Sequence, residues 1–206
     1  MGTGTLTIPI FPLPEVVFFP ETHLPLHVFE PRYVELVNDA LDSDGMIGVV
    51  QLRPGWDKDY YGQPPTYKVL GVGKIVDSER LKDGRFDIVL HGRFRAHIVS
   101  EALKGEYRTA EVEVLKDTLQ PDDSEEVLWV HERLLELYKK LVAAMPESMS
   151  LMESPSPGAL IDIMADKLVE NPYDKQSILS EVDIARRQRL LRVQLRAMVK
   201  GTQQES

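Results

Sequence analysis

The chain has 206 residues, of which 43% are hydrophobic and 28% charged, and it contains no cysteine. This composition is typical of a folded soluble protein, and it excludes disulfides, thiolate metal sites and cysteine nucleophiles. The formal net charge is -9, with an acidic excess in both halves, which disfavours a nucleic-acid surface. No stretch has the length and hydrophobicity of a membrane span, and no signal peptide opens the chain, so we expect a cytoplasmic protein.

In the first half of the chain, short segments rich in Val, Ile, Phe and Tyr alternate with turn residues, which predicts β-strands. In the clearest of them every second residue is apolar, as at Phe86, Ile88 and Leu90, so one face should be buried. Asp83-Gly84 predicts a hairpin with a type I′ turn. The strands are expected to form an antiparallel meander curled into a small barrel, and they span residues 5–11, 24–29, 46–52, 67–76, 85–91, 94–99 and 107–115.

One helix is expected among these strands. Pro31 suits a first helical position, and apolar residues follow at helical spacing until Gly45. The prolines before it cannot donate ladder hydrogen bonds, so they suit connections or sheet edges. Glu30 and Arg32 flank Pro31, and two interpretations stay open. We favour an ion pair that fixes this corner of the fold over direct contact with a ligand.

The segment between Arg53 and Thr66 is a loop rich in Pro and Gly. It carries the aromatic residues Trp56, Tyr60 and Tyr61. Aromatic side chains on such a loop are typical recognition elements, but they can equally pack down as a lid over the barrel. The sequence leaves both interpretations open.

After Gln120-Pro121 the period of the apolar residues changes from two to about 3.6, which predicts helices. Asp123 to Glu126 fits a capping box for the first of them. Further helices are expected after the cap Ser156, from Asp174, and along residues 184–198. The chain is thus predicted to be an α+β protein, with a β domain over residues 1–117 and a helical bundle over residues 118–206.

No motif for catalysis or for cofactor binding stands out. Gly71 to Lys74 matches a phosphate loop only in part, and close strand packing is the preferred interpretation. His23 and His27 share a strand face without a clear third ligand. The basic residues of the last helix, from Arg186 to Lys200, are interpreted as a solvated helix face. We therefore predict no enzyme, no cofactor and no metal site.

Several motifs taken together resemble one known family. They are IPIFPLPEVVFFPETHLPLHVFEPRYVELVNDAL, GMIGVVQL, GVGKIVDSERLKDGRFDIVLHGRFRAHI and YRTAEVEVL. Over residues 5–115 the chain resembles the N-terminal domain of Lon proteases in its stand-alone bacterial form, and the helices up to Lys200 resemble the bundle that follows it. Pro20-Glu21 departs from the pattern, because the family usually has Pro-Gly there.

The resemblance implies a PUA-like β barrel with one inserted helix, joined to a helical bundle, that recognises unfolded or exposed protein segments. The ATPase and Ser-Lys protease domains of Lon have no counterpart in the sequence, so a non-catalytic module is expected. An RNA-binding PUA-like protein is the alternative, which the acidic charge disfavours. Whether a protease or chaperone is a partner, and whether the chain forms a homodimer, stays open. The candidates for substrate binding are Glu30, Arg32, Trp56, Tyr60 and Tyr61.

Overall fold

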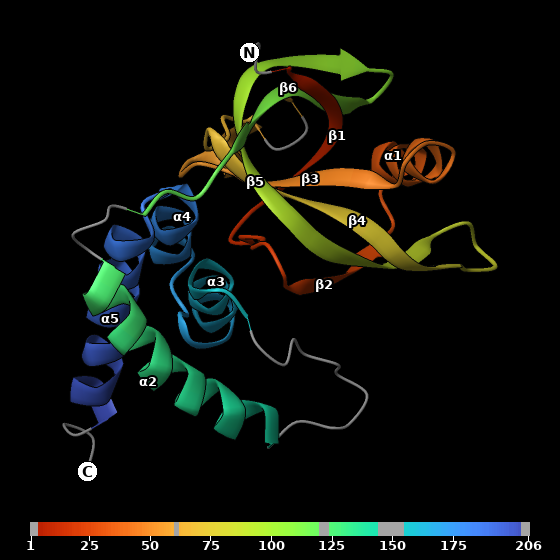
Figure 1. The fold of residues 1–206 in the computed structure, drawn as a ribbon. Helices are drawn as coiled ribbons and strands as arrows, with labels where there is room; N and C mark the ends of the chain where they lie inside the picture. Colours follow the sequence, from red (N-terminus) through yellow and green to blue (C-terminus); the bar gives the residue numbers. More distant parts are fainter. Residues whose placement is uncertain (1–3, 60–61, 120–123, 144–154, 203–206) are drawn as a thin grey trace. The chain divides into compact units, whose positions relative to one another are not determined.

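The structure, a computed structural model, describes residues 4–59, 62–119, 124–143 and 155–202 (Figure 1). Contacts between Cα atoms divide the chain into two compact units, residues 1–115 and residues 116–206. The division falls beside the boundary at residue 117 that the change of hydrophobic period predicts. Whether each unit folds by itself stays a prediction.

The first unit is a six-stranded sheet with one helix. Its strands are β1 (Leu6–Leu13), β2 (His23–Val28), β3 (Met46–Gln51), β4 (Val69–Arg80), β5 (Phe86–Lys104) and β6 (Tyr107–Leu115). Their order is β2-β5-β4-β3-β1-β6, and a further pairing of β6 with β5 closes the ring. Among the described strands only β2 pairs on a single side. The predicted α+β class is confirmed.

The ring is mixed rather than wholly antiparallel. β1 runs parallel to β3, with Ile10 opposite Gly48 and Leu13 opposite Gln51. A parallel pair needs a long crossover, and here β2 and helix α1 (Pro31–Leu41) lie within it. The predicted antiparallel meander is therefore wrong for β1. A meander pairs strands in chain order, whereas β1 skips β2 and pairs with β3 and β6.

Two of the predicted strands, residues 85–91 and 94–99, are one long strand, β5. Gly92 lies where the break was expected, but a Cβ there would stand 2.1 Å from the carbonyl oxygen of Phe19. A Cβ on Gly71 in β4 would similarly stand 1.9 Å from the carbonyl oxygen of Phe18. Both phenylalanines are buried, so the proline-rich connection lies directly on the strand backbones. Close packing is thus confirmed for the glycines of the segment from Gly71 to Lys74.

The hairpin between β4 and β5 forms as predicted, but its turn is of another type. Gly84 has a φ of 88°, whereas Asp83 is not among the residues with positive φ. The Gly84 N–H donates to the carbonyl oxygen of Leu81 at 3.0 Å. This matches a longer hairpin loop in which a left-handed Gly follows an ordinary turn, so the type I′ prediction was wrong.

Two apolar cores support the sheet. The first fills the ring and draws on all five of its strands, with Ile8, Ile10, Val50, Leu70, Val72, Ala96, Ile98, Ala110 and Val112. The second includes the buried residues of α1, which are Tyr33, Leu36, Val37 and Ala40. The predicted helix and its start at Pro31 are therefore confirmed, and its burial fixes the helix against the sheet.

The second unit is helical, with α2 (Ser124–Ala143), α3 (Pro157–Leu168), α4 (Pro172–Ser180) and α5 (Ile184–Thr202). Ser156 caps α3 as predicted. α4 begins before the predicted start at Asp174, because Asn171 accepts hydrogen bonds at its N-terminus. The predicted capping box at Asp123 lies outside the described residues. No helix in the described part of the chain is long and apolar enough to cross a membrane.

A buried arginine links the helices of this unit to the segment before them. Arg187 on α5 is fully buried, and its guanidinium donates to both carboxylate oxygens of Asp117, at 3.0 and 2.5 Å. Asp162 on α3 is also buried, and its Oδ1 lies 3.7 Å from Nη1 of Arg187. The interpretation of the basic run as a solvated face is therefore wrong for Arg187, whereas Arg186 and Arg196 are exposed.

Candidate functional site

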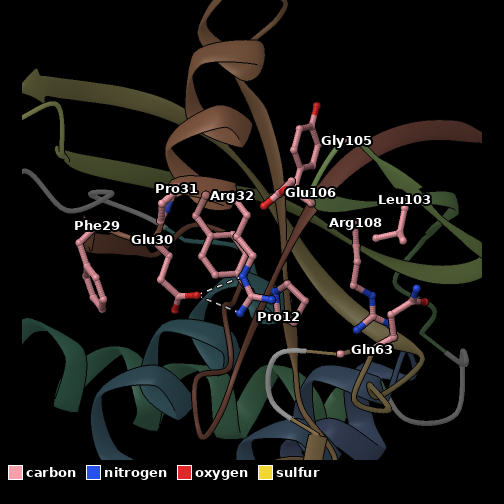
Figure 2. Close-up of a pocket in the computed structure, with 13 residues that line it drawn as sticks. Pro12, Phe29, Glu30, Pro31, Arg32, Gln63, Leu103, Gly105, Glu106 and Arg108 are labelled. Carbon is pink, nitrogen blue, oxygen red and sulfur yellow. Dashed lines mark hydrogen bonds and ion pairs between the residues drawn. The ribbon is translucent and has the colours of Figure 1, made fainter.

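A groove of about 800 Å³ opens on the first unit (Figure 2). It is formed where the start of α1 meets the loop after β3 and the β5–β6 hairpin. Segments far apart in the sequence therefore share one surface. The lining residues are Pro12, Phe29, Glu30, Pro31, Arg32, Tyr33, Gly62, Gln63, Leu103, Gly105, Glu106, Tyr107 and Arg108.

An ion pair at the start of α1 forms one wall of the groove. Nε of Arg32 donates to Oε2 of Glu30 at 3.1 Å, and Nη2 lies 2.9 Å from the same oxygen (Figure 2). The guanidinium also lies over the ring of Tyr33, 4.6 Å from its centroid. Tyr33 is buried and packs against Phe11, with 4.1 Å between ring centroids. These contacts suit the favoured role of the pair in fixing this corner, and they also place both side chains at the groove.

The opposite wall joins the loop after β3 to the β5–β6 hairpin. Arg108 forms an ion pair with Glu101, and it donates to the carbonyl oxygen of Pro64 at 2.9 Å. The Thr66 hydroxyl donates to the other oxygen of Glu101 at 3.1 Å. Because the returning end of the loop is held in this way, Gly62 and Gln63 reach the groove.

The tip of the hairpin is fastened to α1. The Tyr107 hydroxyl donates to Oδ2 of Asp39 at 2.7 Å, and Nζ of Lys104 lies 2.8 Å from the same oxygen. The hydrogen bond from Lys104, with a further one from Tyr107, holds the pKa of Asp39 below its usual value. The hydrogen bond to Asp39 also raises the pKa of Lys104. The charge of Lys104 is thus already compensated within the fold.

Two large apolar side chains are exposed at the groove. Phe29 is 61% exposed and Leu103 is 56% exposed. Exposed apolar residues rimmed by polar groups are typical of surfaces that bind other molecules, because contact removes them from water. The described lining residues therefore suit noncovalent binding through apolar contact, hydrogen bonds and charge.

The structure brings together some of the predicted site residues. Glu30 and Arg32 line the groove. Trp56 begins a short 3₁₀ helix and is half-buried, and it does not line the groove. Tyr60 and Tyr61 lie outside the described residues, although the two residues that follow them are part of the lining.

Sequence reasoning missed Phe29, Leu103 and Glu106, which also line the groove. Phe29 directly precedes the Glu30 motif, and its place at the end of a strand was the available signal. Leu103 and Glu106 carried no such signal, because residues 100–104 were predicted to connect two strands and instead extend β5.

The two histidines considered as metal ligands have other neighbours. The His23 ring packs against that of His91, with 4.7 Å between centroids. Nδ1 of His27 lies 2.6 Å from Oδ1 of Asp87. Across the described ranges, no group of three or more His, Asp or Glu side chains is arranged to hold a metal ion.

Comparison with known proteins links residues 7–196 to the family described as the ATP-dependent protease La (LON) substrate-binding domain. "Lon protease 2" of Myxococcus xanthus is 30% identical over 190 residues, which are 89% of this chain and 23% of that protein. The Lon protease of Escherichia coli strain K12 is 27% identical over 88% of this chain and 24% of its own length. The chain thus spans about a quarter of these relatives.

Two solved structures share the fold. One is a Lon N-terminal domain protein from Xanthomonas campestris, with a TM-score of 0.65, 23% identity, and coverage of 91% of this chain and 98% of the other. The second is the N-terminal domain of a Mycobacterium avium complex Lon protease, with a TM-score of 0.65 and 18% identity. It covers 90% of this chain and 96% of that domain.

Proposed function

Because this chain belongs to the family of Lon substrate-binding domains, we propose that it binds unfolded or exposed segments of other proteins through the groove described above. The family description supports substrate binding in general. The observation that carries the choice of surface is the pair of exposed apolar side chains, Phe29 and Leu103, that line the groove. Unfolded chains expose apolar side chains that a folded protein buries, and these are the groups that such a surface would cover.

The walls of the groove suit this use because they are fixed before a partner arrives. Arg32 is held by Glu30, and Arg108 by Glu101 and the loop backbone. A surface whose polar side chains are already ordered loses less conformational entropy on binding. The ordered walls thus favour binding, while the small exposed apolar surface limits the affinity, so we expect weak binding to many extended segments.

The proposal is limited to recognition. The match to Lon proteases covers about a quarter of their length and falls on the part that the family describes as substrate-binding. We propose no ATP hydrolysis and no peptidase activity for the residues present here. Transfer of a bound segment to a protease or chaperone is compatible with this role.

A titration tests the proposal directly. A fluorescently labelled, permanently unfolded model protein is titrated with the wild type and with the variant Phe29→Ala/Leu103→Ala. Because both side chains are exposed, the variant should keep its melting temperature, while its affinity falls by about tenfold or more, equivalent to roughly 1 to 3 kcal/mol. Val76→Ala is the matched control, since Val76 is 50% exposed on β4 and does not line the groove.

Two results would contradict the proposal. One is wild-type protein that binds no unfolded polypeptide at micromolar concentration. The other is an equal loss of affinity in the Val76→Ala control. If the wild type instead binds structured RNA with a strong dependence on salt, RNA binding becomes the function to pursue.

The aromatic loop needs a separate test, because Trp56 does not line the groove. If Trp56 and Tyr60 contact the client, replacing both with Ala should weaken binding by about tenfold and leave the melting temperature unchanged. If they form a lid on the β unit, the same variant should melt at a lower temperature with unchanged affinity. A thermal melt and a titration of the one variant distinguish these two roles.

A further inference from the structure

The cations around the groove already have anionic partners. Arg32 pairs with Glu30 at 2.9 Å, and Lys104 pairs with Asp39 at 2.8 Å. Arg108 is paired in the same way with Glu101 across the hairpin. None of these three positive charges is therefore available to attract an anionic partner without first breaking a contact within the fold.

Two carboxylates beside the groove are not balanced in this way. Glu106 lies in the connection between β5 and β6 and lines the groove. Glu35 is exposed on α1, and a Cβ placed on Gly105 would stand 2.6 Å from its Oε1, so it lies at the same hairpin. Within the described residues, the carboxylates of Glu35 and Glu106 have neither a hydrogen-bond partner nor an ion-pair partner. The groove therefore has an excess of negative charge.

We propose that the groove selects segments in which Lys or Arg lies near apolar residues. The inference rests on the proposed function and names the chemistry of its substrate. In the view of Figure 2, Phe29 and Leu103 lie at opposite ends of the groove, and Glu106 lies between them. An extended segment can therefore place apolar side chains at the two ends and a cation near Glu106.

Each ion pair between a groove carboxylate and a bound segment adds little to the affinity, and its contribution depends on the salt concentration. An exposed ion pair raises the affinity by about two- to fivefold. An acidic side chain in the same place lowers the affinity by a similar factor, because it is repelled. Two unbalanced carboxylates should therefore separate basic from acidic segments by about tenfold at low ionic strength. Screening should reduce this preference as salt rises.

Three fluorescein-labelled peptides of about 12 residues provide the probe, since an extended segment of that length spans about 40 Å. They share the same apolar residues and differ at two positions, which are Lys, Gln or Glu. Each is titrated with the full chain at about 0.05 M and about 0.5 M NaCl. The Lys peptide should bind about tenfold more tightly than the Glu peptide at low salt, with the Gln peptide between them.

Variants then assign the preference to the two carboxylates. Glu35→Gln/Glu106→Gln should reduce it to about twofold or less, and Glu106→Lys should favour the Glu peptide. Glu113→Gln is the matched control, because it removes one negative charge from an exposed position on β6 that does not line the groove. This control should retain the wild-type preference.

Several outcomes would overturn the inference. Equal affinity for the three peptides would do so, as would a preference that Glu113→Gln reduces as much as the double variant does. If all three bind equally and Phe29→Ala/Leu103→Ala weakens each of them, selectivity is lost but the proposed function stands. If no peptide binds to the wild type, both the selectivity and the proposed function fail.

Discussion

Glu21 adopts a backbone conformation that favours glycine, with a φ of 60°. It occupies the position where the family that the sequence resembles usually has Gly. An L-residue in this region is strained by about 1 kcal/mol, so Glu21→Gly should raise the free energy of unfolding by roughly that amount in a urea titration. Glu21→Ala is the control, because it removes the carboxylate near His91 but keeps the strain. Equal stability of the two variants would contradict the prediction.

The stability of the β unit should depend on the protonation of His91. Burial, followed by the charges of His23 and Arg93, lowers the pKa of His91, while Glu21 acts in the opposite direction. The unfolded chain therefore takes up this proton at a higher pH than the folded chain does. Stability should be full above about pH 6.5, the ordinary value for His, and should fall as the pH drops below it.

The variant His91→Gln tests this assignment. Urea titrations between about pH 7 and pH 5 should show a shallower loss of stability for the variant than for the wild type. An unchanged slope would assign the pH dependence to other groups.

Among the helices, the buried charges on α3 and α5 should stabilise the second unit. Arg187→Leu leaves Asp162 buried and without this cation, which should lower the free energy of unfolding by about 3 to 5 kcal/mol. Arg186→Leu changes the same residue type at the next, exposed position and should have little effect. A small effect of Arg187→Leu would show that the buried pair contributes little.

The elements that could be predicted are those set by local patterns. α1 begins at Pro31 and α3 is capped by Ser156, because helix ends depend on residues a few positions apart. The continuity of β5 and the parallel pairing of β1 with β3 could not be predicted in the same way. They depend on the contact of Phe19 with Gly92 and on the closure of the ring, which join segments far apart in the sequence.

The composition of the groove likewise depends on contacts between segments that are far apart in the sequence. The motif around Pro31 drew attention to Glu30 and Arg32 without any knowledge of their neighbours. Leu103 and Glu106 join them only because β5 extends to Lys104 and its hairpin reaches α1. No local pattern in the sequence indicates how far β5 extends or that its hairpin contacts α1.

At the scale of the whole molecule, both cores of the β unit and the groove are built from residues 8–112. A fragment of residues 1–115 should therefore fold alone and bind the unfolded model protein within about twofold of the full chain. Circular dichroism and the same titration measure these two properties. A folded fragment without affinity would show that binding needs residues after 115.

The open edge of β2 bears on the proposed binding of unfolded chains. Strands from such chains add readily to an open edge and can seed cross-β stacking. β2 is the one described strand with such an edge, and Pro25 at its middle has no N–H to donate to an added strand. The β unit should thus offer any segment that it binds under the proposed function a poor template for amyloid growth.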